Sequence, residues 1–155
     1  MTNQDALKLN IELSQLLAEY WFEVDVNLGR DAARYYTPDA EFHGPFASYI
    51  GPQKIQQFYD WRIAQGPRLA VHSFTNLHVR YTASDSCEAN YYMFIYAENG
   101  TKVLPSSPPN TISLMTERFR RGPGGQWLCS YRRFETLFEG DTPVTNPNLD
   151  DPVTE

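Results

Sequence analysis

The hydrophobic pattern of this chain changes its period near residue 68, and this change restricts the folds that the chain can adopt. Before it, apolar residues recur at steps of three and four, which is typical of amphipathic helices. After it, segments rich in aromatic and β-branched residues alternate with period two, as strands do: 69–81, 87–98, 111–121 and 127–138. Helices followed by a run of antiparallel strands indicate an α+β domain.

Three helices are expected in the N-terminal part. The first spans residues 5–28 and is stopped by a glycine, the second spans 31–36, and the third spans 51–66. Pro52 suits the start of the third helix, where a missing amide proton costs nothing. Between the second and third helices, a Thr-Pro-Asp turn is predicted to lead into a short strand at 40–43.

The 155 residues are enough for one domain with a sizeable core. We expect a single domain over residues 1–140. Residues 141–155 contain few apolar side chains and three prolines, which predicts a flexible tail. The segment from Asn99 to Asn110 contains several turn-forming residues and is long enough to be a candidate lid.

Charge and cysteine content exclude several classes of partner. The 13 Lys and Arg against 19 Asp and Glu give a net charge of -6, without a basic run that would neutralise nucleic-acid phosphates. The N-terminal segment has neither the cationic start of a signal peptide nor a continuous apolar span, so we expect a cytoplasmic protein that does not enter membranes. Cys87 and Cys129 are expected to stay reduced, and no ligand spacing predicts a metal site.

Asp25 and His72 are polar residues in otherwise apolar elements. A carboxylate that fixes the tautomer of an imidazole, and supports the imidazolium, makes that imidazole a general base. The helix dipole does not favour an acidic residue near the end of the first helix, which supports a functional interpretation of Asp25. With period two, His72 shares its face of the strand with Phe74, Asn76 and His78, a mixture suited to a ligand cavity.

Four short strings carry a resemblance to a known family: Val24-Asp25, the Tyr-Thr-Pro-Asp-Ala-Glu-Phe string that ends at Phe42, Gly51-Pro52, and His72-Ser-Phe-Thr-Asn-Leu77. Through them, residues 5–138 resemble SnoaL-like members of the NTF2-like superfamily. The nearest branch contains scytalone dehydratase, bile-acid dehydratase and hexachlorocyclohexane dehydrochlorinase. The resemblance implies a cystatin-like cone, in which three N-terminal helices pack on a strongly curved antiparallel sheet and enclose a pocket.

The same resemblance implies catalytic roles. Asp25 and His72 correspond to the proton-abstracting dyad, and Tyr20 lies where the dehydratases have a tyrosine and the dehydrochlorinase has a lysine. A phenol there favours an oxygen over a halide as the leaving group. Arg132 matches a family arginine that points at the dyad. The second pocket histidine of scytalone dehydratase has no counterpart in the aromatic and aliphatic stretch 90–96.

Other residues are candidates for binding a partly apolar, cyclic substrate. Asn76 can orient it, and large side chains can form the pocket wall; the full set is Asn76, Trp21, Phe42, Tyr49, Phe74, Tyr91, Met93 and Phe94. Because residues 90–96 are apolar on both faces, the outer face of the sheet needs cover. We therefore expect a homo-oligomer, a dimer or a trimer.

These features together predict a small lyase of the dehydratase type that needs no cofactor. Its base would abstract a proton next to a carbonyl or another activated carbon. Two alternatives use the same parts, namely an isomerase like ketosteroid isomerase and a polyketide cyclase. A third, the non-catalytic small subunit of a ring-hydroxylating oxygenase, and a fourth, a ligand-binding protein, need no base.

Overall fold

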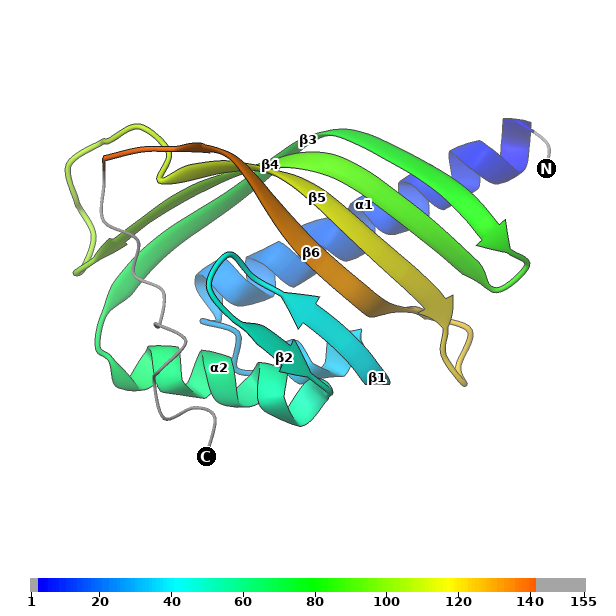
Figure 1. Ribbon diagram of the computed structural model, residues 1–155, viewed down its shortest axis with the longest axis horizontal. Coiled ribbons are helices and arrows are strands. Elements are labelled where there is room, and N and C mark those ends of the chain that lie inside the picture. The colour runs from blue at the N-terminus through cyan, green and yellow to red at the C-terminus, as the bar shows by residue number, and fades with distance from the viewer. Residues whose placement is uncertain (1–2, 142–155) are drawn as a thin grey trace.

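The computed structural model describes residues 3–141 (Figure 1). One six-stranded sheet, in the order β2-β1-β6-β5-β4-β3, curves around two α-helices, and all neighbouring strands are antiparallel except β1 and β6. The elements are α1 (Asn3–Val26), a 3₁₀ turn η1 (Ala32–Tyr35), β1 (Tyr36–His43), β2 (Ser48–Ile50), α2 (Pro52–Ala64), β3 (Arg68–Ala83), β4 (Ser86–Asn99), β5 (Thr111–Arg121) and β6 (Trp127–Glu139).

The four long strands and the α+β class agree with the prediction from period, but the helix count was wrong. The second predicted helix is only the four-residue turn η1, so two α-helices pack on the sheet rather than three. The predicted turn at 37–39 is also wrong, because β1 begins at Tyr36 and pairs with β6. Pro38 is tolerated there because the pairing of β1 with β6 is interrupted between Tyr36 and Glu41, so no hydrogen bond is lost.

Helix α1 supplies the centre of the core. Leu9, Leu13 and Leu17, spaced four residues apart, are fully buried, and the stripe continues through Tyr20 and Trp21. Figure 1 shows α1 running along one face of the curved sheet, with α2 closing the end that lies beyond β1 and β2. The C-terminal half of α1 is thereby held between the sheet and α2.

A β-bulge in β3 reverses the faces of its side chains. The pairing with β4 shifts between Thr75 and His78, and Asn76 adopts a left-handed backbone with a φ of 56°. Before the bulge, His72 points inward; after it, Leu77 is the residue that packs against the core, while Asn76 and His78 are exposed. The predicted common face of His72, Asn76 and His78 is therefore wrong.

Three further sequence predictions concern single features. Cys87 and Cys129 are free, as predicted, and burial raises the pKa of each thiol to about 12. No helix within residues 3–141 has the length and apolarity needed to cross a membrane. The predicted tail lies outside the described residues except for Asp141.

The loop after α1 contacts α2 closely. Gly29 has a φ of 77°, and a Cβ placed on it would lie 2.5 Å from Cδ1 of Tyr59. The left-handed backbone and the missing side chain are both needed here, because they let the Tyr59 ring pack directly against the chain. Gly125, in the hairpin before β6, has almost the same φ of 80°, but a Cβ placed on it would meet only open space.

These two glycines allow strain and crowding to be separated. Gly125→Ala should lower the free energy of unfolding by about 1–2 kcal/mol, the cost of a left-handed backbone. Gly29→Ala should lower it by about 1–3 kcal/mol more, because the Tyr59 ring must move. Urea unfolding followed by circular dichroism would measure both, and equal losses would contradict the close packing of Tyr59 on the loop.

Candidate active site

The Asp25 carboxylate joins the end of α1 to the first half of β3. Its Oδ1 lies 2.6 Å from Nδ1 of His72, and its Oδ2 accepts a hydrogen bond of 2.7 Å from the backbone N–H of the same residue. The two side chains are 6% and 15% exposed for His72 and Asp25, respectively. Both carboxylate oxygens are thus used to fix one residue, which leaves the imidazole little freedom to rotate.

The surroundings of His72 keep its ring neutral. Trp21 stacks on the imidazole with ring centroids 4.4 Å apart and an angle of 13° between the planes. Burial lowers the pKa of His72 below its usual 6.5; the hydrogen bond and charge of Asp25 oppose this shift, and the charges of Arg68 and Arg62 add to it. In the neutral ring, Nδ1–H donates to Asp25, so Nε2 carries the free lone pair.

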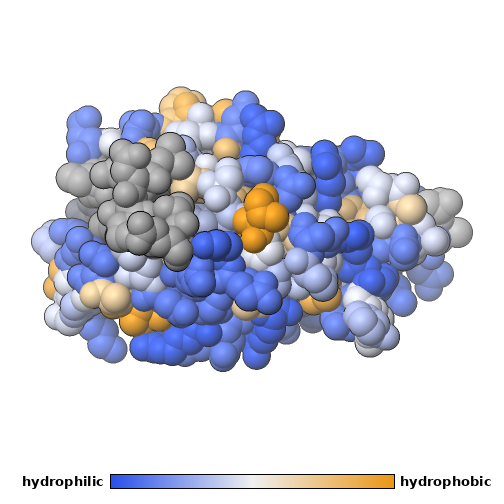
Figure 2. Space-filling view, turned by 60° about the horizontal axis from the view of Figure 1, so that its bottom comes forward, coloured by the Kyte–Doolittle hydropathy of each residue, from blue (hydrophilic) through white to orange (hydrophobic). Residues whose placement is uncertain are grey.

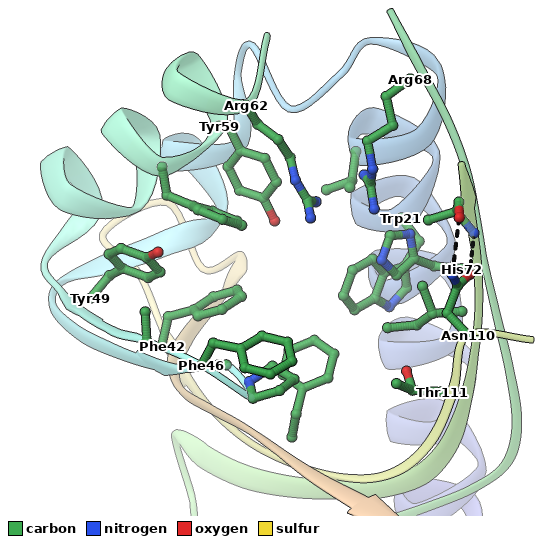
Figure 3. Close-up of a pocket in the computed structure, with 18 residues that line it drawn as sticks. Trp21, Phe42, Phe46, Tyr49, Tyr59, Arg62, Arg68, His72, Asn110 and Thr111 are labelled. Atoms are coloured by element: carbon green, nitrogen blue, oxygen red, sulfur yellow. Dashed lines mark hydrogen bonds between the residues drawn. The ribbon is translucent and has the colours of Figure 1, made fainter. Parts of the chain in front are cut away.

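A cavity with an empty volume of about 700 Å³, including solvent at its mouth, lies beside this imidazole. Helices α1 and α2, strands β1, β3, β4 and β6 and the loop between β1 and β2 contribute to its wall (Figure 3). Much of the wall is aromatic: Trp21, Phe42, Phe46, Tyr49, Phe58 and Phe134. A planar, partly apolar molecule fits such a wall, and exclusion of water strengthens polar contacts inside it.

Tyr59 presents the phenol that reaches this cavity. It lines the wall, and its hydroxyl lies 2.6 Å from the hydroxyl of Tyr20, which in turn lies 2.6 Å from that of Tyr36. Burial raises the pKa of all three phenols, so each remains protonated at neutral pH. Tyr20 was predicted to act in the pocket itself, but it lies behind the wall and touches the cavity only through Tyr59.

Arg132 also lies behind the wall rather than on it. Its guanidinium binds both oxygens of Glu117, at 2.8 and 3.0 Å, and Nη1 donates a hydrogen bond of 2.6 Å to Tyr36. It also stacks over the ring of Tyr20, 3.8 Å from the centroid. The expected direct contact between Arg132 and the reacting atoms is therefore not available.

The predicted wall residues divide into two groups. Trp21, Phe42 and Tyr49 line the cavity together with His72. Tyr91 and Met93 are buried in the core instead, and Phe74 packs edge-on against Tyr91. The bulge turns Asn76 outward, and alternation along β4 places Phe94 on the face opposite Met93.

Sequence reasoning missed three polar residues of the wall. Tyr59 and Arg62 come from α2, and Arg68 is the first residue of β3. One signal was present: Arg68 lies four residues before His72, so period two puts both on one face of the strand. Asn110 and Thr111, at the end of the candidate lid and the start of β5, also line the cavity.

No group of three His, Cys, Asp or Glu residues that could hold a metal ion occurs within residues 3–141. The chemistry available to the described wall is therefore that of its own side chains. These are an imidazole backed by a carboxylate, a phenol backed by a chain of phenols, and two guanidinium groups. An imidazole and a phenol on one apolar cavity can move a proton from carbon and stabilise charge that develops on oxygen.

Comparisons with known proteins find the fold but no sequence family. No protein-family model and no curated protein matches the chain. Solved structures do match, among them a Catenulispora acidiphila protein with a TM-score of 0.74 and 20% identity, covering 86% of this chain and 95% of that one. ActVI-ORFA from Streptomyces coelicolor has a TM-score of 0.72 and 17% identity, covering 84% and 98%.

Two further matches define the class of fold. A scytalone dehydratase-like protein from Novosphingobium aromaticivorans has a TM-score of 0.71 and 18% identity, covering 97% of both chains. A Nostoc punctiforme protein with a cystatin-like fold has a TM-score of 0.65 and 15% identity, covering 88% and 93%. The chain thus has the cystatin-like fold of the SnoaL-like and NTF2-like proteins, as its sequence motifs predicted.

The state of the His72 ring can be measured without a substrate. Nitrogen-detected NMR should show the Nδ1–H tautomer and a pKa below 6.5. In Asp25→Asn the pKa should fall further, because the carboxylate that raises it is gone, and the single amide oxygen can serve only one of the two donors of His72.

The sign of this shift also predicts an effect of pH on stability. The folded protein binds the His72 proton less readily than the unfolded chain, so this residue makes stability fall as the pH drops from about 6.5 through its folded pKa. Asp60→Asn, at an exposed position of α2, should leave the His72 titration unchanged. A wild-type pKa at or above 6.5 would contradict the neutral resting state.

Proposed function

We propose that this protein is a small cofactor-independent lyase of the dehydratase type, acting on a cyclic or aromatic small molecule. One observation carries the proposal: Asp25 holds Nδ1 of a neutral imidazole whose ring lines an aromatic cavity. His72 would abstract a proton from a carbon next to a carbonyl, and Asp25 would stabilise the imidazolium that forms. A protein that only bound a ligand would have no need for this arrangement.

The chain of phenols supports a donor on the other side of the reaction. Arg132 can only donate, so the Tyr36 oxygen accepts from it and the single Tyr36 proton goes to Tyr20. Tyr20 then donates to Tyr59. The Tyr59 proton is left for an oxygen in the cavity, where it would stabilise the developing oxyanion or protonate the departing hydroxyl. Tyr59 thus takes the role first expected of Tyr20.

The same base and donor would also serve an isomerase or a cyclase. An isomerase returns the abstracted proton to a different carbon, and a cyclase forms a carbon–carbon bond from the carbanion, so neither reaction requires a hydroxyl group on the substrate to leave. Loss of water from a cyclic β-hydroxy ketone therefore separates the dehydratase from the isomerase. The non-catalytic alternatives predict that no reaction depends on His72.

A suitable test substrate is 3-hydroxy-1-tetralone, which gives 1-naphthol when it loses water. Wild-type protein should accelerate the appearance of naphthol absorbance. His72→Ala should reduce the rate by about 10²–10⁴-fold, the usual contribution of a general base, and Tyr59→Phe by about 10²-fold. His78→Ala, at an exposed position of the same strand, should keep the full rate.

Each other outcome has a definite meaning. Naphthol formation at the wild-type rate in His72→Ala would contradict the proposed base. Exchange of the substrate α-hydrogen for deuterium without release of naphthol, lost in His72→Ala, would identify an isomerase instead. Acceleration that persists in Tyr59→Phe would remove Tyr59, but not His72, from the mechanism.

We further propose that a second copy of the chain covers the outer face of the sheet. Val71 pairs with Tyr96, and Phe94, Ile112 and Phe138 lie in one row across β4, β5 and β6. Val71 is 56% exposed and Phe138 is 66% exposed, which are large values for apolar strand residues. The side of the molecule that carries α2 is mostly hydrophilic (Figure 2) and suits contact with water.

Light scattering after gel filtration would test this assembly. The wild type should have the mass of a dimer or a trimer, and Tyr96→Lys on the outer sheet face should give monomers. Phe22→Lys, at an exposed aromatic position of α1, should leave the mass unchanged. A monomeric wild-type protein would contradict the proposal.

A further inference from the structure

Two arginines from neighbouring elements meet on the cavity wall. Arg62 lies in the last turn of α2 and Arg68 opens β3, so the short turn between them brings both side chains to one side. Figure 3 shows both guanidinium groups directed toward the cavity, across from Phe42 and Phe46. The same two residues line a second pocket of about 390 Å³, which also contains Asp25, and so separate the two spaces.

The charge of this wall is opposite to that of the protein. The chain has a net charge of -6, but among the described residues that line the larger cavity Arg62 and Arg68 carry positive charge, and none is an Asp or a Glu. Burial and the charge of Arg62 lower the pKa of Arg68 to about 9, which still leaves it protonated at neutral pH. Burial likewise lowers the pKa of Arg62. Two partly desolvated cations therefore face an otherwise aromatic space.

We infer that Arg62 and Arg68 form an anion subsite that holds the carboxylate of an aromatic or cyclic acid beside His72. Planar guanidinium groups match the geometry of a carboxylate, and hydrogen bonds to it are stronger where water is excluded. The ring of such an acid would lie among Trp21, Phe42 and Phe46. The substrate class rests on the proposed function, whereas the anion subsite does not require any reaction.

The subsite would also act on the base. The groups whose charges bear on His72 are Asp25 from α1, Arg62 from α2, and Arg68 from its own strand, while Trp21 and the protonated Tyr59 are neutral. The arginines make the imidazole a weaker base, and a carboxylate bound between them would offset their charge. An acid substrate would therefore strengthen the base that acts on it, and by reciprocity a protonated His72 would bind the acid more tightly.

Matched probes test the subsite with the full chain. The two probes are 2-naphthoate and its neutral analogue 2-naphthamide, and titration calorimetry measures their affinities. Wild-type protein should bind the naphthoate at least about tenfold more tightly, as expected for charge-assisted hydrogen bonds. Arg62→Gln and Arg68→Gln should each lose most of this preference while keeping the affinity for the amide. Arg30→Gln, an exposed position after α1, should keep both affinities.

A second readout separates an anion subsite from a structural role of the arginines. Naphthoate should raise the pKa of His72 measured by NMR in the wild type, and naphthamide should not. Equal affinity for the two probes, no measurable binding of naphthoate, or a preference that persists in both variants would overturn the inference. Conversion of hydroxytetralone is measured independently, so failure of the dehydratase proposal leaves a distinct result for the subsite.

Discussion

The buried pair of Arg132 and Glu117 is the contact on which the arrangement around the cavity depends. Their side chains are 1% and 0% exposed, and the guanidinium also touches Tyr36 and the rings of Tyr20 and Trp21. Although burial opposes it, the charge of Glu117 keeps the pKa of Arg132 well above its usual value. Removal of one partner from such a pair typically costs about 3–5 kcal/mol, because the other is left charged and unpaired.

This pair holds together elements that are distant in the sequence. It links β5 and β6 to β1 through Tyr36, and to α1 through Tyr20 and Trp21. Trp21 in turn stacks on His72, so the position of the imidazole depends on the core below it as well as on Asp25. An arginine first expected to touch a substrate thus orders the wall from behind.

The sequence was sufficient to predict the long strands, the first and last helices and the proximity of Asp25 and His72. Periodicity identifies extended elements, and a resemblance places two distant motifs in one fold. It was not sufficient where side-chain direction depends on a local irregularity. One extra residue near Asn76 reversed a strand face, and a five-residue offset on a helix kept Tyr20 from the cavity that Asp25 adjoins.

The arginine pair was missed for a different reason. Neither residue belongs to a motif, and only the turn between α2 and β3 brings them to the same wall. Their effect on His72 is opposite to that of Asp25, so the basicity of the imidazole is set by a balance of charges from three elements. A pattern of residue types along the chain carries no information about such a balance, which requires the distances between elements.

The bulge in β3 divides one long strand into two parts with separate duties. Residues before Asn76 face the cavity, and residues after it pack under α1 as part of the core. Changes that alter the ligand can therefore accumulate in the first part without disturbing the packing of the second. In this fold the capacity to acquire new substrates would depend on a single left-handed residue, which insulates the stability of the domain from variation in its binding site.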